Sequence, residues 1–215
     1  KYFPKQGYRV IAPELPIYNS SLLNTNVKFF AKFVYKFIKF KNLRDVIILG
    51  NSLGGHVGLI FSKLYPKLIK GLVLTGSSGL YENSMGDSYP KREDYNYIKE
   101  RTEAVFFDPK IATKKIVDEV YETVNDRKKL IKILAMAKSA IRHNMSNDLP
   151  NILAETAIIW GENDSVTPPE VADEFKKLLP NSQLFWIENC GHAPMMEHPE
   201  KFNSVMNSWL KEKKL

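Results

Sequence analysis

The sequence has little of several features that would place it in a specialised class. Its single cysteine, Cys190, excludes an internal disulfide, so nothing here requires an oxidising compartment. No apolar run approaches the ~18 residues of a membrane span, and the opening residues lack the apolar core of a signal peptide. Internal repeats, low-complexity tracts and Pro/Gly-rich linkers are missing too. We therefore expect a cytoplasmic protein with no membrane span.

The chain is long enough for one substantial domain. It has 215 residues, of which 44% are hydrophobic, and its net charge is +7. Because the lysines are scattered, the charge favours a solvated basic surface, with an electrostatic partner or the steering of anionic substrates as the alternative. We expect a small-molecule substrate and no nucleic acid, and a homodimer is left open.

Strand-like and helix-like segments alternate, which is typical of an α/β fold with a mostly parallel sheet flanked by helices. Residues 77–149 break this alternation with three helical patterns, near 91–106, 110–124 and 126–143. The sequence predicts a core of residues 1–76 and 150–215 with an inserted helical cap, 77–149. The predicted strands are 8–13, 45–50, 69–76, 156–161 and 182–188, and the core helices are 27–40, 52–65, 168–179 and 199–214.

The helix over 27–40 is amphipathic, with an aromatic stripe on one side and lysines on the other. Docking of the aromatic stripe on the sheet is favoured over a position on a membrane surface.

Ser52 stands in a Gly-x-Ser-x-Gly pattern between a strand and a helix. A sharp strand-to-helix turn strains the serine and leaves no room for side chains two residues to either side, which would explain Gly50 and Gly54. The pattern predicts Ser52 as a nucleophile and the Leu53 N–H as an oxyanion donor. The alternative is a helix N-cap serine beside a flexible turn.

A serine nucleophile needs a base and an orienting acid. His192 follows the last predicted strand, where a loop would present its ring to the site. His56 is expected to be a packing or surface residue, His143 could line a pocket, and His198 is expected at the start of a helix. For the acid, Asp164 follows a buried strand, although it could simply cap the next helix. The order Ser52, Asp164, His192 matches one known scaffold.

These motifs resemble the α/β-hydrolase superfamily with a helical cap. The matching stretches are GNSLGG (50–55), WGEND (160–164) and CGHAP (190–194) with Glu197 and Pro199. The resemblance implies that Ser52 is the nucleophile, His192 the general base and acid, and Asp164 its orienting partner. The Leu53 N–H would supply one oxyanion donor.

Members of this family usually carry an earlier strand with a His-Gly loop that gives the second oxyanion donor. We expect that the N-terminal strands are missing and that this chain by itself has weak or no activity, because losing such a donor costs ~10²–10³ in rate. An esterase rate equal to that of an N-terminally extended form would contradict this.

Asn51 and the stretch IVDEVYETVNDRKK (116–129) are similar to the meta-cleavage-product hydrolases, which cut carbon–carbon bonds. Those enzymes usually carry an arginine and a tryptophan where Val120 and Ala193 stand. Whether Arg127 or Arg142 takes the place of that arginine is left open. Hydrolysis of a small to medium, largely apolar ester is therefore favoured over carbon–carbon cleavage. A non-catalytic ligand-binding protein of the same fold is the third reading.

The predicted substrate pocket contains Asn51, Tyr121, Met136 and His143, although the apolar residues of the cap could equally form its own small core. No metal-ligand cluster or Gly-rich phosphate loop is present, so we expect no cofactor and no metal. Cys190, although next to the predicted base in sequence, is expected to be a small buried residue.

Overall fold

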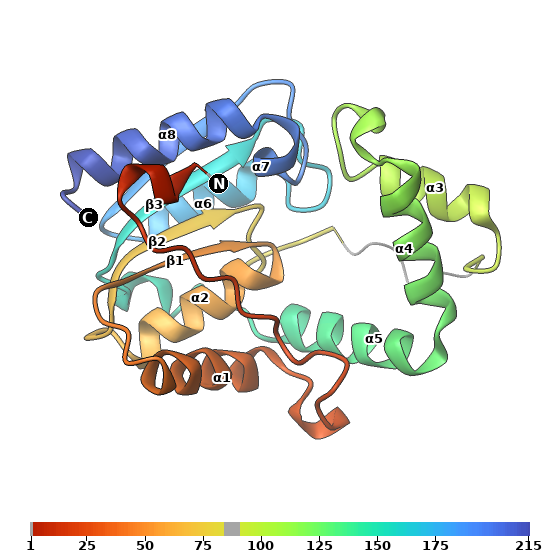
Figure 1. Cartoon of the computed structure of the whole chain (residues 1–215), viewed down its shortest axis with the longest axis horizontal. Coiled ribbons are helices and arrows are strands. Elements are labelled where there is room, and N and C mark those ends of the chain that lie inside the picture. The colour runs from red at the N-terminus through yellow and green to blue at the C-terminus, as the bar shows by residue number, and fades with distance from the viewer. Residues whose placement is uncertain (1, 84–90) are drawn as a thin grey trace.

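The chain folds around a parallel β-sheet in the computed structural model, which describes residues 2–83 and 91–215. Within these residues the sheet has four strands in the order β1-β2-β3-β4, and every neighbouring pair is parallel (Figure 1). The strands are β1 (Val46–Asn51), β2 (Ile69–Thr75), β3 (Glu155–Gly161) and β4 (Ser182–Ile187). The expected α/β fold is therefore confirmed, and these strand boundaries lie within about one residue of the predicted ones.

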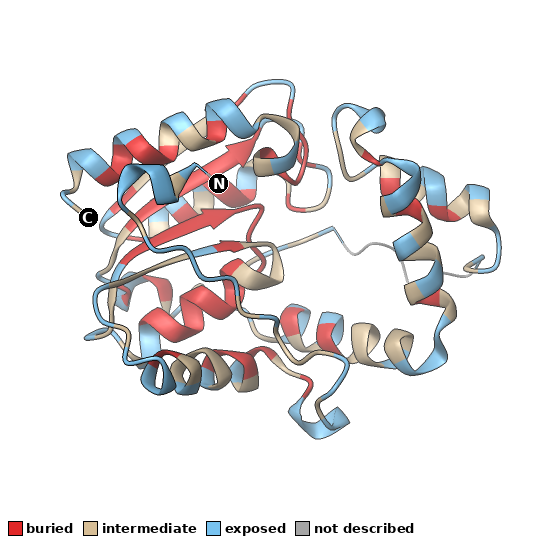
Figure 2. Ribbon diagram, in the orientation of Figure 1, coloured by how far each residue is buried: buried red, intermediate tan, exposed pale blue. Residues whose placement is uncertain are grey.

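Side chains of the central strands alternate between two hydrophobic cores, as a period of two requires. Leu72 and Leu74 of β2 enter one core, whereas Val73 enters the other. The first core is completed by α1 (Val27–Phe40), α2 (Leu53–Leu64) and α6 (Pro169–Leu178), and the second by α8 (Pro199–Glu212). Figure 2 shows the buried residues concentrated on the strands and on the helix sides that face them. Helices thus cover both faces of the sheet.

Helix α1 begins at the predicted residue. The Asn26 side chain caps it by accepting a hydrogen bond from the Phe29 N–H at 2.9 Å. Its apolar side packs on α2, with Phe30 and Ala31 fully buried, while the lysines remain exposed. The stripe is therefore buried inside the protein as predicted, but its main partner is α2 rather than the sheet itself.

The segment between β2 and β3 is helical in its described part, without a strand. Its elements are α3 (Tyr95–Glu103), η3 (Pro109–Ile111), α4 (Lys114–Asn125), α5 (Arg127–Arg142) and η4 (Leu149–Asn151). Capping side chains mark the starts of α3, α4 and α5, namely Asp94, Thr113 and Asp126. In Figure 1, α3 and α4 stand away from the sheet, and α5 leads back towards α1.

The predicted strand at residues 8–13 is wrong. These residues form no strand, and Val10 and Ile11 are 60% and 37% exposed. A strand exists through its ladder of backbone hydrogen bonds, and no described strand lies beside this segment. The β-branched pattern alone therefore misled the prediction. The short helices η1 (Phe3–Gln6), η2 (Leu22–Asn24) and α7 (Pro194–Glu197) were not predicted.

Candidate active site

Ser52 lies at the turn between β1 and α2 in a strained backbone conformation. Its φ is 52° and its ψ is −120°, outside the regions that non-glycine residues favour. The Ser52 N–H donates to the Thr75 carbonyl at 3.0 Å, which fixes the turn to the end of β2. Ser52 stands at the N-cap position of α2, but its hydroxyl makes no capping hydrogen bond to the helix. The start of α2 therefore does not depend on this hydroxyl.

Two glycines allow this turn to close. A Cβ on Gly50 would lie 2.3 Å from the Gly54 carbonyl group, and one on Gly55 would lie 2.3 Å from the Ser77 hydroxyl oxygen. A Cβ on Gly54 would meet nothing within 4 Å. The expected crowding two residues before Ser52 is therefore confirmed. On the other side it is wrong by one position, because Gly55 rather than Gly54 faces the chain after β2.

The Leu53 N–H lies at the first position of α2. An N–H at this position has no acceptor within its own helix, and it carries the positive end of the helix dipole. The field at the start of α2 therefore favours negative charge beside Ser52.

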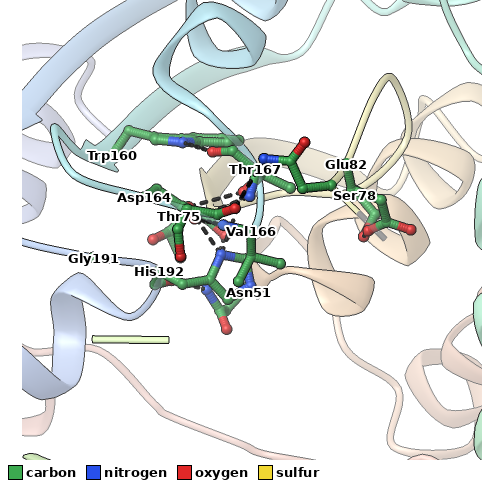
Figure 3. Close-up of polar contacts among 12 residues, drawn as sticks. Asn51, Thr75, Ser78, Glu82, Trp160, Asp164, Val166, Thr167, Gly191 and His192 are labelled. Atoms are coloured by element: carbon green, nitrogen blue, oxygen red, sulfur yellow. Dashed lines mark hydrogen bonds and ion pairs between the residues drawn. The ribbon is translucent and has the colours of Figure 1, made fainter. Parts of the chain in front are cut away.

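Asp164 and His192 form a buried pair at the ends of β3 and β4. The His192 Nδ1 and the Asp164 Oδ2 are 2.8 Å apart, and Figure 3 shows the two side chains facing each other. The Asp164 side chain is fully buried and that of His192 is 9% exposed. A carboxylate in this position fixes which ring nitrogen carries the proton, leaving Nε2 as the basic atom.

The Asp164 carboxylate is held by further donors. Its Oδ1 accepts the N–H groups of Val166 and Thr167, both at 2.9 Å, and its Oδ2 accepts the Thr167 hydroxyl at 2.8 Å. Asp164 thus organises the turn before α6 but is not the N-cap of that helix, which is Pro168. Sequence reasoning missed Thr167, although a hydroxyl three residues after an aspartate is a turn signature.

The backbone of His192 is fixed from the side of Ser52. The Asn51 side-chain amide donates to the His192 carbonyl and to the Thr75 carbonyl, both at 3.0 Å. Gly76, with a φ of +48°, lets the imidazole approach the chain after β2, because a Cβ there would lie 2.7 Å from the ring Nδ1. The residue before Ser52 therefore links the serine turn to the histidine loop. Within the described chain no hydrogen bond joins the Ser52 hydroxyl directly to His192.

A third link ties the histidine loop to the helical segment. The His192 N–H donates to the Val105 carbonyl at 3.0 Å. The Glu197 carboxylate accepts the Gly191 N–H at 2.7 Å on one oxygen and the Phe107 N–H at 2.8 Å on the other. The sequence assigned Glu197 no role of its own, because its partner Phe107 is 90 residues away along the chain.

The whole chain is similar to known proteins. The family model for the α/β hydrolase fold matches residues 1–199. The chain belongs to the α/β hydrolase family. A solved α/β hydrolase enzyme from the metagenome of sediments of the Mar Chica lagoon, Morocco, is 50% identical. That alignment covers 100% of this chain and 83% of the solved one, with a TM-score of 0.81.

Curated members of the family that resemble this chain carry different activities in their names. A 2-hydroxy-6-oxononadienedioate/2-hydroxy-6-oxononatrienedioate hydrolase of Comamonas testosteroni is 25% identical over 97% of this chain and 79% of its own. Lipase 1 of Psychrobacter immobilis is 24% identical over 89% of this chain and 65% of its own. The comparisons therefore identify the family but leave the substrate open.

The other three histidines of this hydrolase-family chain have structural contacts. His56 is fully buried, and its Nε2 lies 3.0 Å from the His143 Nδ1. Burial, reinforced by the charge on His143, lowers the pKa of His56 to about 3. Burial also lowers the pKa of His143. His198 is the N-cap of α8, as predicted, and its Nε2 lies 2.8 Å from the Asn189 carbonyl oxygen.

Cys190 is fully buried, as expected. Burial, together with the negative charge of Glu197, raises the pKa of its thiol. The thiol therefore stays protonated and is a poor nucleophile.

The residues predicted to line a substrate pocket all have other contacts. Asn51 and His143 are engaged as described above, and the Tyr121 hydroxyl donates to the Glu93 carbonyl at 3.1 Å. Met136 is 4% exposed and belongs to the first hydrophobic core. Their place in a pocket stays a prediction. Met136 does not belong to a separate core of the cap, because it packs in the main core beside α1 and α2.

Residues 2–83 and 91–215 contain neither a cluster of metal ligands nor a membrane-spanning helix. No group of three or more histidine, cysteine, aspartate or glutamate side chains is placed to hold a metal ion in residues 2–83 and 91–215. No helix in this part of the chain combines the length and apolarity needed to cross a membrane.

Proposed function

We propose that the chain is a serine hydrolase that cleaves a small to medium, largely apolar carboxylic ester through an acyl-enzyme. The observation that carries this proposal is the buried 2.8 Å contact between His192 and Asp164, set beside a strained serine with an unengaged hydroxyl. Membership of the α/β hydrolase family supports it. A purely ligand-binding protein would not need a serine, an acid and a histidine in this arrangement.

In the proposed reaction, the Ser52 hydroxyl attacks the ester carbonyl while His192 Nε2 takes its proton. Asp164 stabilises the imidazolium that forms, and the Leu53 N–H donates to the oxygen that becomes negative. The imidazolium then protonates the leaving alcohol. Water, activated by the same nitrogen, attacks the acyl-enzyme, and the carboxylic acid leaves as Ser52 regains its proton.

The helical segment between β2 and β3 is proposed to act as a cap over this site. Its support is the pair of links at residues 105–107, because the Val105 carbonyl binds the His192 backbone and Glu197 binds the Phe107 N–H. A displacement of the segment would therefore shift the backbone of His192, so the position of the cap would affect the position of the base.

Cleavage of a carbon–carbon bond is the second candidate. One observation favours it, the likeness to the Comamonas testosteroni hydrolase named above. Against it, Val120 and Ala193 are apolar at the positions that carry an arginine and a tryptophan in the meta-cleavage-product hydrolases. A valine cannot pair with the carboxylate of such a substrate, so ester cleavage remains first.

The test compares two substrates and two serine variants. Purified protein is assayed with p-nitrophenyl acetate and with a dienoate chromophore, beside the Ser52→Ala and Ser62→Ala variants. Ser62 lies on the same helix but its hydroxyl donates to the Gly58 carbonyl at 2.7 Å, so it serves as the matched control. In keeping with the weak activity expected of this chain by itself, we expect slow ester turnover that Ser52→Ala abolishes and Ser62→Ala retains. Turnover of the dienoate alone would favour carbon–carbon cleavage over ester cleavage. Equal ester turnover by Ser52→Ala and Ser62→Ala would refute a mechanism that uses Ser52.

A further inference from the structure

Positive charge is concentrated in two segments that contain no acidic residue. Residues 15–44 and residues 127–147 each hold six lysines and arginines and no aspartate or glutamate. Since the whole chain has a net charge of +7, all its other residues together carry a net charge of −5. The charge is therefore separated along the chain rather than evenly scattered.

The two basic segments lie side by side in the fold. Helix α1 of the first packs against α5 of the second, and the Val27 N–H donates to the Ser139 hydroxyl at 3.2 Å. The Lys132 ammonium donates to the Ser20 carbonyl, and the Lys129 ammonium lies 5.6 Å from the centre of the Tyr18 ring. In Figure 1, α1 and α5 lie along the edge of the molecule opposite α8. We call this surface of α1, η2 and α5 the basic face.

Charges on the basic face are not neutralised internally. Four lysines of α1 recur along one exposed stripe, at positions 28, 32, 36 and 39. Within residues 2–83 and 91–215, none of the twelve cations of the two segments forms an ion pair with a carboxylate, whereas Lys63, Lys114 and Lys213 elsewhere do. The stripe is therefore available to an external anion.

An exposed apolar turn adjoins this stripe. Leu22 and Leu23 form η2 just before α1, and they are 54% and 90% exposed. Figure 1 shows the η2 turn projecting beyond α1 and α5. Paired leucines that project into water beside unpaired lysines match the two layers of an anionic bilayer, whose interior takes apolar groups and whose headgroups take cations. A nucleic acid would use the lysines but offers two exposed leucines no comparable apolar layer.

We propose that the basic face docks on an anionic phospholipid bilayer, with Leu22 and Leu23 entering the headgroup region. Only residues 41–45 join α1 to β1, so the end of α1 lies near the start of β1. The start of α1, with η2, therefore lies towards the end of the sheet where Ser52 follows β1. The docked chain would present that end towards the lipid. This inference does not depend on the proposed reaction, because it concerns binding alone.

The test is co-sedimentation of the purified chain with vesicles. One set is phosphatidylcholine and the other contains about one third phosphatidylserine, chosen to give a negative surface potential. We expect binding to the anionic vesicles only, and loss of binding when salt rises from about 0.1 M to about 1 M, where the screening length falls to ~3 Å.

Two variants and a control separate the contributions. The first variant combines Lys28→Gln, Lys32→Gln and Lys36→Gln. It should bind anionic vesicles about 10²-fold more weakly, since each lysine near the membrane surface contributes roughly a factor of five to the affinity. Leu22→Ser with Leu23→Ser should weaken it about tenfold or more. The control changes three exposed lysines away from the basic face to glutamine, at positions 110, 201 and 211, and should bind like the unchanged protein.

Each opposite result overturns the proposal. These results are no binding to anionic vesicles, equal loss in the stripe variant and the control, or unchanged binding in the leucine variant. Binding to a short DNA duplex without binding to vesicles would assign the basic face to nucleic acid instead. All the changed residues are exposed, and circular dichroism melts confirm that the variants are folded before binding is compared.

Discussion

Replacing Gly76 by alanine should disrupt the candidate site although it adds only one methyl group. Gly76 follows β2, has a φ of +48°, and touches the imidazole that Asp164 holds. An alanine Cβ would lie 2.7 Å from the Nδ1 and 2.8 Å from the Cε1 of His192. Since comfortable contacts between such atoms begin at about 3.5 Å, the ring must move by about 0.8 Å or more.

The expected cost has two parts. A non-glycine residue in the left-handed region costs about 1–2 kcal/mol. Displacement of the ring weakens a hydrogen bond to a charged, buried carboxylate, which contributes about 1.5–3 kcal/mol. Gly76→Ala should therefore lower the free energy of unfolding by about 2–4 kcal/mol, and a misplacement near 1 Å should slow the reaction of Ser52 about 10²-fold.

Urea unfolding and the rate of labelling by a fluorophosphonate measure the two effects. Gly54→Ala is the control for stability, because a Cβ there meets nothing within 4 Å and alanine favours a helix more than glycine does. Its free energy of unfolding should not decrease. If Gly76→Ala unfolds and reacts like the unchanged protein, the close approach of Gly76 to His192 is not a feature of the molecule.

Three other changes test separate contacts. Asp164→Asn should leave the chain folded but reduce the reactivity of Ser52 by about 10⁴, because the histidine tautomer is no longer fixed; a loss under tenfold in the labelling rate would contradict this. The lowered pKa of His56, about 3 against 6.5 when unfolded, means that the unfolded chain binds a proton the folded chain does not. That contribution to stability is complete above pH 6.5 and is lost as the pH falls towards 3. Below the unfolded pKa, urea unfolding should show a loss of stability of roughly 1 kcal/mol per pH unit that His56→Gln removes and His198→Gln does not. If the slopes are equal, His56 does not titrate as described. Glu197→Gln should cost about 1–3 kcal/mol of stability and speed amide exchange at residues 107 and 191, since one carboxylate oxygen becomes an NH₂ group; unchanged exchange would rule out the link.

Much of the fold follows from the sequence because its signals are local. Strands β2 and β3 carry the short apolar runs 71–74 and 157–160, which suit burial on both faces, and every residue of these runs is buried. The four core helices lie within about two residues of their predicted bounds. Residues 8–13 carry the same β-branched signal, yet they form no strand, because a strand also needs a neighbour and a single sequence cannot show whether one is present.

The candidate site was predictable in its chemistry but not in its support. The strand ends brought Asp164 and His192 together as the chain order implied. The contacts of Glu197 with residues near 107, and of His56 with His143, join positions about 90 residues apart, at 3.0 Å in the case of the two rings. No periodicity or motif encodes such pairs, because they arise from how the helical segment packs on the core. The crowded glycine after Ser52 is Gly55 and not the predicted Gly54 for the same reason, because the crowding comes from Ser77, which the chain brings in after β2.

The central claim is that Ser52 is the activated nucleophile, and the most direct measurement is the position of a covalent adduct. The protein is treated with a fluorophosphonate, digested with trypsin and analysed by mass spectrometry. Ser52 and Ser62 share one tryptic peptide, residues 45–63, so fragmentation must distinguish them. The account predicts one adduct, on Ser52, that is lost in His192→Ala. Absence of an adduct, or an adduct that forms equally in His192→Ala, would contradict it.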